Sequence, residues 1–193
     1  TDTYSAIAGA VGSLKGPLHG GANAKVMQMF RDVKAHVDAK DDGSIRDYLV
    51  KILSREAGDR SGKIYGLGHA VYTLSDPRAV LLKKYAGHLA EIKGFADDFA
   101  LLEKVETIGA SLLQEKRRSD DPICANVDMY SGLVYHMLGI PQEVFTPLFA
   151  SARMVGWAAH RMEELLTGKR IIRPAYKPIT KVKPYIPLCD RKD

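Results

Sequence analysis

Cysteine is scarce in this chain, because only Cys124 and Cys189 occur among its 193 residues. They form neither a Cys-x-x-Cys pair nor any other metal-ligand spacing, so the sequence supports no metal site. The low count also excludes a disulfide-rich scaffold, and two free thiols are typical of a reducing compartment. We therefore expect a cytoplasmic protein that binds no metal.

Long apolar runs are also absent. No stretch approaches the roughly 18 consecutive apolar residues of a membrane span. The start, Thr1-Asp2-Thr3-Tyr4, lacks the basic and then apolar layout of a signal peptide. We therefore expect no membrane partner. Because Thr1 is not a methionine and helical periodicity begins almost at once, we also expect the later part of a longer protein.

Acidic residues are too few to balance the basic ones, which leaves a net charge of +5. Such a charge favours nucleic acid, a membrane surface or an anionic metabolite, but a solvated basic tail also accounts for it. The basic residues form no stripe and no pattern interleaved with aromatic residues, so no nucleic-acid partner is expected. An anionic small molecule held by scattered arginines fits better. The basic residues near the chain end are Lys177, Lys181, Lys183, Arg191 and Lys192.

Alternation of apolar and polar residues over the length of a strand is missing, apart from a short hairpin expected around residues 64–72. Apolar residues instead recur every three or four positions, as on one face of a helix. The sequence therefore predicts an all-α fold. The expected helices are 4–14, 26–37, 45–53, 77 onward, 98–117, 127–138 and 145–166.

Individual residues mark the ends of these helices. Gly16-Pro17 ends the first helix, and Ser44 with Asp47 predicts a capping box for the third. Asp76-Pro77 is a strong start, because the aspartate caps and the proline needs no N–H there. After Gly168, prolines at 174, 178, 184 and 187 exclude both helix and central strand, which predicts an extended C-terminal tail.

Three short segments each place one proton-handling side chain beside glycines. The side chains are His19, His69 and Asp128. Glycine allows tight turns and the close approach of another molecule. Two imidazoles and one carboxylate held in this way suit carbon-acid chemistry, which needs a base for a C–H proton and donors for the oxyanion that develops. The segments are Gly16-Pro17-Leu18-His19-Gly20-Gly21-Ala22-Asn23, Tyr65-Gly66-Leu67-Gly68-His69 and Asn126-Val127-Asp128-Met129-Tyr130-Ser131-Gly132.

Each residue also has a purely structural interpretation. His19, at a helix end, could only cap or pack, and Asp128 could be a helix-capping aspartate. The turn before His69 could bend the chain or cradle a phosphate, but it lacks the third glycine and the preceding strand of a dinucleotide fingerprint. The other histidines lie within expected helices and are interpreted as surface or packed residues; they are His36, His88, His136 and His160.

The three segments, in this order and spacing, resemble citrate synthase. The likeness continues through Asp76-Pro77-Arg78, residues 145–157 and Arg170-Ile171-Ile172-Arg173-Pro174, and so covers nearly the whole chain. The resemblance implies a helical small domain at residues 22–132, flanked by large-domain segments at 1–21 and 133–193. Most of the large domain, from the N-terminal half of the family's chain, would be missing.

The resemblance also implies a role for each candidate residue. Asp128 is the base for acetyl-CoA, His19 stabilises the enolate, and His69 polarises the oxaloacetate ketone and protonates the new alcohol. The backbone of Gly66, Leu67 and Gly68 borders the adenine of coenzyme A.

Three arginines lie where the family places ligands for the carboxylates of oxaloacetate: Arg78, Arg153 and Arg173. Planar guanidinium forks match carboxylates better than lysine does. Arg173 would serve the site of a neighbouring subunit, because the family's tail reaches the partner in a homodimer. Each arginine could instead be a surface residue, and Arg170 competes with Arg173 for the role.

The implied reaction condenses acetyl-CoA with oxaloacetate to citrate and free CoA, through an enolate and hydrolysis of citryl-CoA. It needs no metal or redox cofactor. One alternative is 2-methylcitrate synthase, which uses propionyl-CoA and differs by one methylene in the acyl pocket. The other is a non-catalytic fragment that binds only coenzyme A, because nothing in residues 1–15 matches a further oxaloacetate-binding histidine of the family. We expect the isolated fragment to be inactive.

Overall fold

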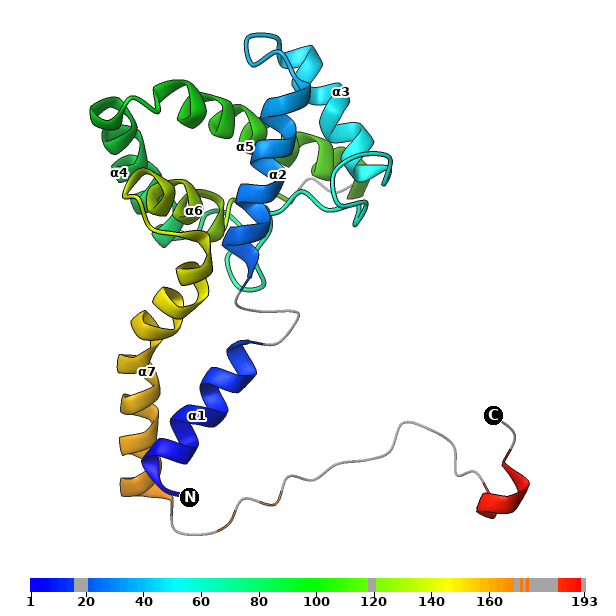
Figure 1. Cartoon of the computed structure of the whole chain (residues 1–193), viewed down its shortest axis with the longest axis vertical. Helices are drawn as coiled ribbons and strands as arrows, with labels where there is room; N and C mark the ends of the chain where they lie inside the picture. Colours follow the sequence, from blue (N-terminus) through cyan, green and yellow to red (C-terminus); the bar gives the residue numbers. More distant parts are fainter. Residues whose placement is uncertain (16–20, 118–120, 169–170, 172, 174–183, 192–193) are drawn as a thin grey trace.

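The computed structural model describes residues 1–15, 21–117, 121–168, 171, 173 and 184–191. Within these ranges the chain forms α-helices and two short 3-10 turns, and no strand (Figure 1). The predicted all-α class is confirmed. The elements are α1 (Thr3–Leu14), α2 (Ala22–His36), α3 (Asp42–Leu53), α4 (Pro77–Lys93), α5 (Ala96–Arg117), α6 (Asp128–Met137), η1 (Gln142–Val144), α7 (Phe145–Thr167) and η2 (Leu188–Asp190).

The hydrophobic core lies among helices α2 to α6 and ends at the first residue of α7. Helix α6 is its most buried element and contacts both α2 and α4. Its close approach to α2 depends on Gly132, because a Cβ there would lie 2.5 Å from Cγ of Met27 and 3.0 Å from the backbone oxygen of Asn23. Helix α6 is therefore a fixed platform for Asp128, its first residue.

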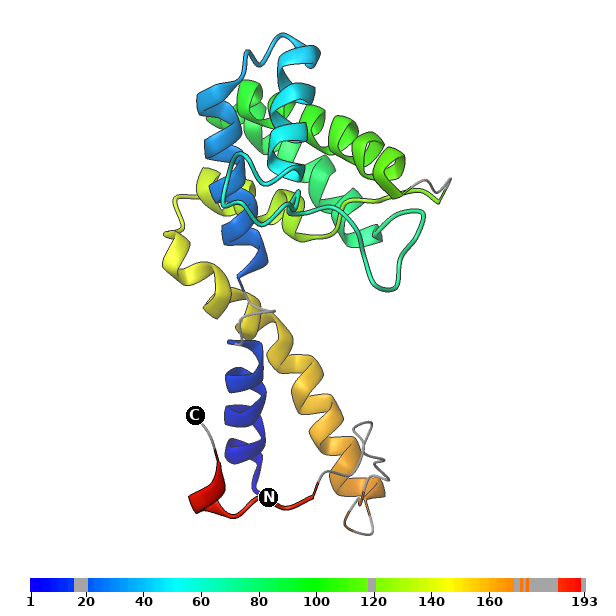
Figure 2. The ribbon, with the colours of Figure 1, turned by 90° about the vertical axis from the view of Figure 1, so that its right-hand side faces the viewer.

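Helices α1 and α7 lie side by side, away from the bundle of α2 to α6 (Figures 1 and 2). Each buries a single residue, Leu14 in α1 and Phe145 in α7. Large apolar side chains on this pair are exposed, and they are Tyr4, Val11, Met154, Val155, Met162, Leu165 and Leu166. The described chain thus leaves an apolar surface on these two helices uncovered.

The predicted helix ends are confirmed in part. Asp76 caps α4, where its carboxylate accepts the N–H of Arg78 at 3.0 Å. The capping box on Ser44 is wrong, because the Asp41 carboxylate accepts the N–H of Gly43 at 2.9 Å and starts α3 earlier. The Ser44 hydroxyl instead accepts a bond from the backbone of the preceding loop.

The hairpin expected around residues 64–72 is also wrong. Gly66 and Gly68 adopt positive φ angles of 88° and 89°, which interrupt an extended strand. The segment makes one isolated antiparallel bridge, between Leu67 and Ala125. Most of the predicted C-terminal tail lies outside the described residues, and the part near the end forms the single turn η2 after Pro187.

Nothing in the structure tests the predicted domain boundaries, which stay predictions. None of the helices in the described ranges combines the length and hydropathy that crossing a bilayer requires. Cys124 and Cys189 are both free thiols, as expected.

Candidate active site

The glycine turn at residues 66–68 is bound to the chain that leads into α6. The N–H of Gly68 donates to the carbonyl of Cys124 at 2.8 Å, and the N–H of Asn126 donates to the carbonyl of Gly66 at 2.9 Å. The side-chain amide of Asn126 also donates to the carbonyl of Gly68 at 3.0 Å. Two of the three predicted segments are therefore brought together by backbone and amide hydrogen bonds.

Glycine is required at residue 66 for two reasons. Its φ of 88° is a left-handed conformation that other residues adopt only with strain. A Cβ there would also lie 2.6 Å from Sδ and 3.0 Å from Cα of Met129, the residue after Asp128. The turn that positions His69 thus packs directly against the start of α6.

The loop after the turn fixes the orientation of His69. Its Nδ1 lies 3.0 Å from the backbone nitrogens of both Val71 and Tyr72, and the ring contacts the Tyr72 ring at a centroid distance of 4.7 Å. Backbone N–H groups only donate, so Nδ1 must accept, and a neutral imidazole then carries its proton on Nε2. His69 therefore presents a hydrogen-bond donor to the site.

Arg78 and Asp76 form the charged part of the site. Asp76 accepts from Nε of Arg78 at 3.0 Å and from Nη2 at 2.9 Å, and its side chain is 0% exposed. The hydrogen bonds from Arg78 lower the pKa of Asp76 despite its burial, and the same pairing raises the pKa of Arg78. Nε2 of His69 lies 3.2 Å from Nη2 of Arg78 and 3.8 Å from the Asp76 carboxylate.

The Nε2–H of His69 and the Nη2 of Arg78 are thus two neighbouring donors. Neither can accept from the other while Nδ1 of His69 accepts from the backbone. A ketone or carboxylate oxygen of a ligand would satisfy both donors at once. The arrangement suits an anionic, carbonyl-bearing small molecule.

Asp128 does not behave as a helix cap. The side chain of Asn126 accepts the N–H of Asp128 at 3.0 Å and so serves the start of α6. The Asp128 carboxylate itself has no hydrogen bond to any residue within the described ranges. Burial raises its pKa, although the positive charges of Arg78 and Arg153 oppose the shift. A half-buried carboxyl with a raised pKa is suited to general-base chemistry.

Of the remaining predicted residues, the structure describes some and not others. Arg153 lies on α7 with its guanidinium 4.5 Å from the ring centre of Phe149, and its charge reaches Asp128. Arg173 is exposed and contacts no other candidate residue of the described chain. His19 lies outside the described residues, and so does Arg170, which competes with Arg173 for the carboxylate-binding role.

Sequence reasoning missed two residues of the site. Asp76 was expected only as a helix cap, and Asn126 only as a neighbour of Asp128. The position of Asp76 two residues before Arg78 could have indicated its role. At this spacing one carboxylate can accept from both the backbone N–H and the guanidinium of Arg78. Within the described ranges, no group of three or more histidines, cysteines or acidic residues is placed to hold a metal ion.

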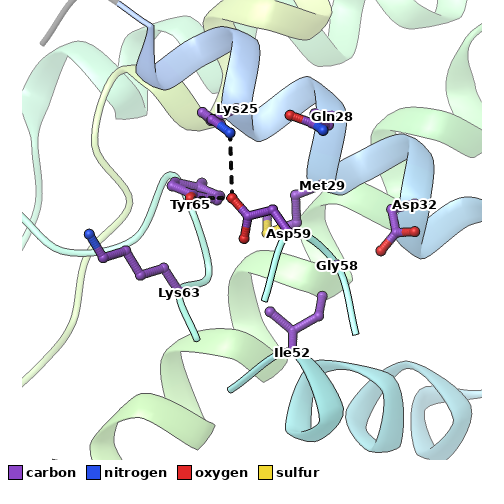
Figure 3. Close-up of a pocket in the computed structure, with 9 residues that line it drawn as sticks. All are labelled: Lys25, Gln28, Met29, Asp32, Ile52, Gly58, Asp59, Lys63 and Tyr65. Atoms are coloured by element: carbon purple, nitrogen blue, oxygen red, sulfur yellow. Dashed lines mark hydrogen bonds and ion pairs between the residues drawn. The ribbon is translucent and has the colours of Figure 1, made fainter. Parts of the chain in front are cut away.

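A separate pocket lies between α2 and the loop before the glycine turn (Figure 3). Asp59 lines this pocket, and its carboxylate accepts hydrogen bonds from the Tyr65 hydroxyl at 2.6 Å and from the N–H of Ser61 at 3.0 Å. The same carboxylate forms an ion pair with Nζ of Lys25 in α2 at 3.5 Å. None of the candidate catalytic residues lines this pocket. Its contacts tie the residue before Gly66 to the core helix α2.

Acid is expected to destabilise the chain through Asp59 and Asp76. Hydrogen bonds from Ser61 and Tyr65 lower the pKa of Asp59, and those from Arg78 lower the pKa of Asp76. Aspartates of the unfolded chain have a pKa of about 3.9. Below about pH 4 the unfolded state therefore binds more protons than the folded state, and the free energy of unfolding decreases. Urea unfolding between about pH 5 and 2.5 should show less pH dependence for Asp59→Asn than for the wild type. Equal slopes would contradict this assignment.

Comparison with known proteins gives the same family at every level. A family model described as citrate synthase, C-terminal domain, matches residues 1–175. The chain is 39% identical over 175 residues to a 2-methylcitrate synthase of Shewanella oneidensis, covering 91% of this chain and 41% of that protein. It is 40% identical over 174 residues to a citrate synthase of Synechocystis sp., covering 90% of this chain and 40% of that protein. The chain thus spans less than half the length of these relatives.

Solved structures agree with the sequences. The citrate synthase of Thermotoga maritima matches with a TM-score of 0.73 and 36% identity, over 100% of this chain and 48% of that one. The citrate synthase of Thermoplasma acidophilum, solved with carboxymethyl coenzyme A and oxaloacetate, matches with a TM-score of 0.71 and 32% identity, over 98% and 47%. The helical core and the glycine turn packed against α6 agree with these matches. Because the family model covers residues 1–175 and the relatives are 39–40% identical, the chain belongs to the citrate synthase family.

Proposed function

We propose that this chain is the C-terminal part of an enzyme that condenses acetyl-CoA with oxaloacetate to give citrate and free CoA. The observation that carries the proposal is the convergence of His69, Arg78 and Asp128 where the glycine turn meets α6. Asp128 has the character of a base, and His69 and Arg78 are hydrogen-bond donors suited to a keto acid. Neither a metal nor a redox cofactor has a step in this reaction.

In the proposed mechanism, Asp128 removes a proton from the methyl carbon of acetyl-CoA. The electron pair moves onto the thioester oxygen, where His19 donates a hydrogen bond to the enolate. The enolate carbon then attacks the ketone carbon of oxaloacetate, and the ketone oxygen receives the Nε2 proton of His69. Water finally attacks the thioester carbonyl of citryl-CoA and gives one proton back to Nε2 of His69. The proton held by Asp128 passes to the departing CoA thiolate, so CoA leaves as the thiol and both residues return to their starting states. The role of His19 rests on the family resemblance alone.

The arginines hold the two carboxylates of oxaloacetate in this proposal. Arg78 and Arg153 act from their own subunit, and Arg173 completes the site of the partner in a homodimer. The exposed apolar surface on α1 and α7 supports the proposal that further chain or a second subunit covers these helices. A cytoplasmic location fits the two free thiols and belongs to the same proposal.

Propionyl-CoA is the alternative acyl donor, because one of the matched relatives is named a 2-methylcitrate synthase. One methylene in an apolar pocket is worth about 1–3 kcal/mol, or roughly 10- to 200-fold in kcat/KM. Steady-state comparison of the two donors on the full-length protein, with oxaloacetate fixed, decides between them. A higher kcat/KM for acetyl-CoA supports citrate synthase, and a higher value for propionyl-CoA supports 2-methylcitrate synthase.

The 193-residue chain alone is expected to show negligible synthase activity. It spans 41% of the matched 2-methylcitrate synthase, so more than half of such an enzyme would be absent. A coupled assay for free CoA thiol measures this, with a blank for the two thiols of the chain. Turnover near that of the full-length protein would overturn the proposal that the chain is a fragment. Binding of CoA without turnover is the result expected of a binding fragment.

A further inference from the structure

Asp76 carries an almost completely buried charge at the centre of the candidate site, with 1% of its surface exposed. Its two carboxylate oxygens serve three groups. Oδ1 accepts from the backbone N–H and from Nε of Arg78, both at 3.0 Å, and Oδ2 accepts from Nη2 at 2.9 Å. Oδ2 also faces Nε2 of His69 at 3.8 Å. A buried carboxylate is costly unless it is paired, and here the pairing partners are both substrate-binding candidates.

The hydrogen bonds between Asp76 and Arg78 occupy only one edge of the guanidinium. A guanidinium offers two donor forks, one from Nε and Nη2 and the other from Nη1 and Nη2. Asp76 occupies the first fork, and Nη1 has no hydrogen bond to any residue of the described chain. Half of the Arg78 side chain surface stays exposed. The second fork, which lies next to His69, is therefore available for a carboxylate.

We propose that Asp76 is a positioning residue that presents the free fork of Arg78 and the Nε2–H of His69 to the same keto acid. The inference rests on the proposed function for the identity of that ligand. Asp76 touches no substrate atom in this scheme and acts only through Arg78 and His69. Its loss should therefore weaken binding of the keto acid and leave binding of the acyl-CoA unchanged.

The substitution Asp76→Asn separates this role from helix capping. Asparagine caps helices about as well as aspartate, so the bond to the Arg78 N–H can persist. The amide has only one acceptor oxygen and no charge, so it cannot hold the guanidinium fork. Asp41→Asn is the matched control, because Asp41 caps α3 in the same way, with Oδ1 2.9 Å from the N–H of Gly43, and lies on the exposed surface.

Kinetics on the full-length protein give the first measurement. For Asp76→Asn we expect KM for oxaloacetate to rise at least about tenfold, because a charged hydrogen bond contributes about 1.5–3 kcal/mol. KM for acetyl-CoA should stay within about twofold of wild type, and the unfolding midpoint should change no more than in Asp41→Asn. Equal rises of both KM values, or no rise for oxaloacetate, would overturn the proposal.

A second measurement needs no substrate and so separates this inference from the proposed function. In the 193-residue chain, nitrogen-15 NMR should show a slowly exchanging Nε–H signal for Arg78 that Asp76→Asn removes and Asp41→Asn keeps. The Nε2 resonance of His69 should shift in Asp76→Asn alone. If the full-length wild type lacks synthase activity while the 193-residue chain shows these signals, the proposed function is refuted but the positioning is not. An unchanged Arg78 signal would refute the positioning. If Asp76→Asn and Asp76→Ser both fail to fold while Asp41→Asn folds, Asp76 is a structural residue and the proposal is wrong.

Discussion

Asp128→Asn is expected to lower the turnover of the full-length protein by at least about 10²–10⁴, the usual loss when a general base is removed. The amide keeps the size and shape of the side chain but cannot take the methyl proton. Because the Asp128 carboxylate has no hydrogen bond to a residue within the described ranges, its replacement should disturb no contact of the bundle. Single-turnover and steady-state assays of CoA release measure the effect.

Equilibrium binding supplies the control for this prediction. The dissociation constants of oxaloacetate and acetyl-CoA should change little in Asp128→Asn. Asp97→Asn, in the exposed first turn of α5, should leave turnover unchanged, because Asp97 lies at a comparable helix position away from the site. Weakened binding with intact turnover in Asp128→Asn would make this residue a structural one.

The second large effect is a gain of activity when two inactive proteins are mixed. If Arg173 completes the partner's site, Arg173→Ala and Asp128→Asn subunits should complement each other in a heterodimer. One of its two sites combines both defects, and the other receives an intact Asp128 from one chain and an intact Arg173 from the other. Dissociating and re-annealing the two full-length variants should therefore restore measurable turnover.

Mass spectrometry of the mixture shows whether heterodimers have formed. If heterodimers are present and every mixture is as inactive as its parents, the shared site does not exist. Arg173 then belongs to the site of its own subunit or to no site. Remixing each variant with itself is the control for damage during re-annealing.

The sequence was sufficient for the helical fold because the strongest signals were local. Asp76-Pro77 and Gly168 marked helix ends correctly, since a cap and a glycine act within one turn. Ser44 was misassigned because Asp41 competes for the same helix start, and both residue types cap well. The expected hairpin failed because the partner of Leu67 is Ala125, far along the chain, which local alternation cannot reveal.

For the candidate site, too, local sequence signals were found and contacts between distant residues were missed. His69, Arg78 and Asp128 were found from segments that resemble a known family, and the structure brings the first two into contact. The role of Asp76 between Arg78 and His69 depends on distances across a loop, which no spacing in the sequence supplies. The assignment of the Nε2 proton likewise depends on the backbone N–H groups of Val71 and Tyr72 facing Nδ1.

Release of CoA thiol from acetyl-CoA by the full-length protein, with and without oxaloacetate, tests the central claim most directly. We expect release to require oxaloacetate and citrate to form in equal amount, and we expect His69→Gln and Asp128→Asn each to abolish most of the CoA release. Release that is independent of oxaloacetate would make the protein a thioesterase. No release under any condition, with CoA still bound, would contradict the claim that this site condenses a keto acid with an acyl-CoA.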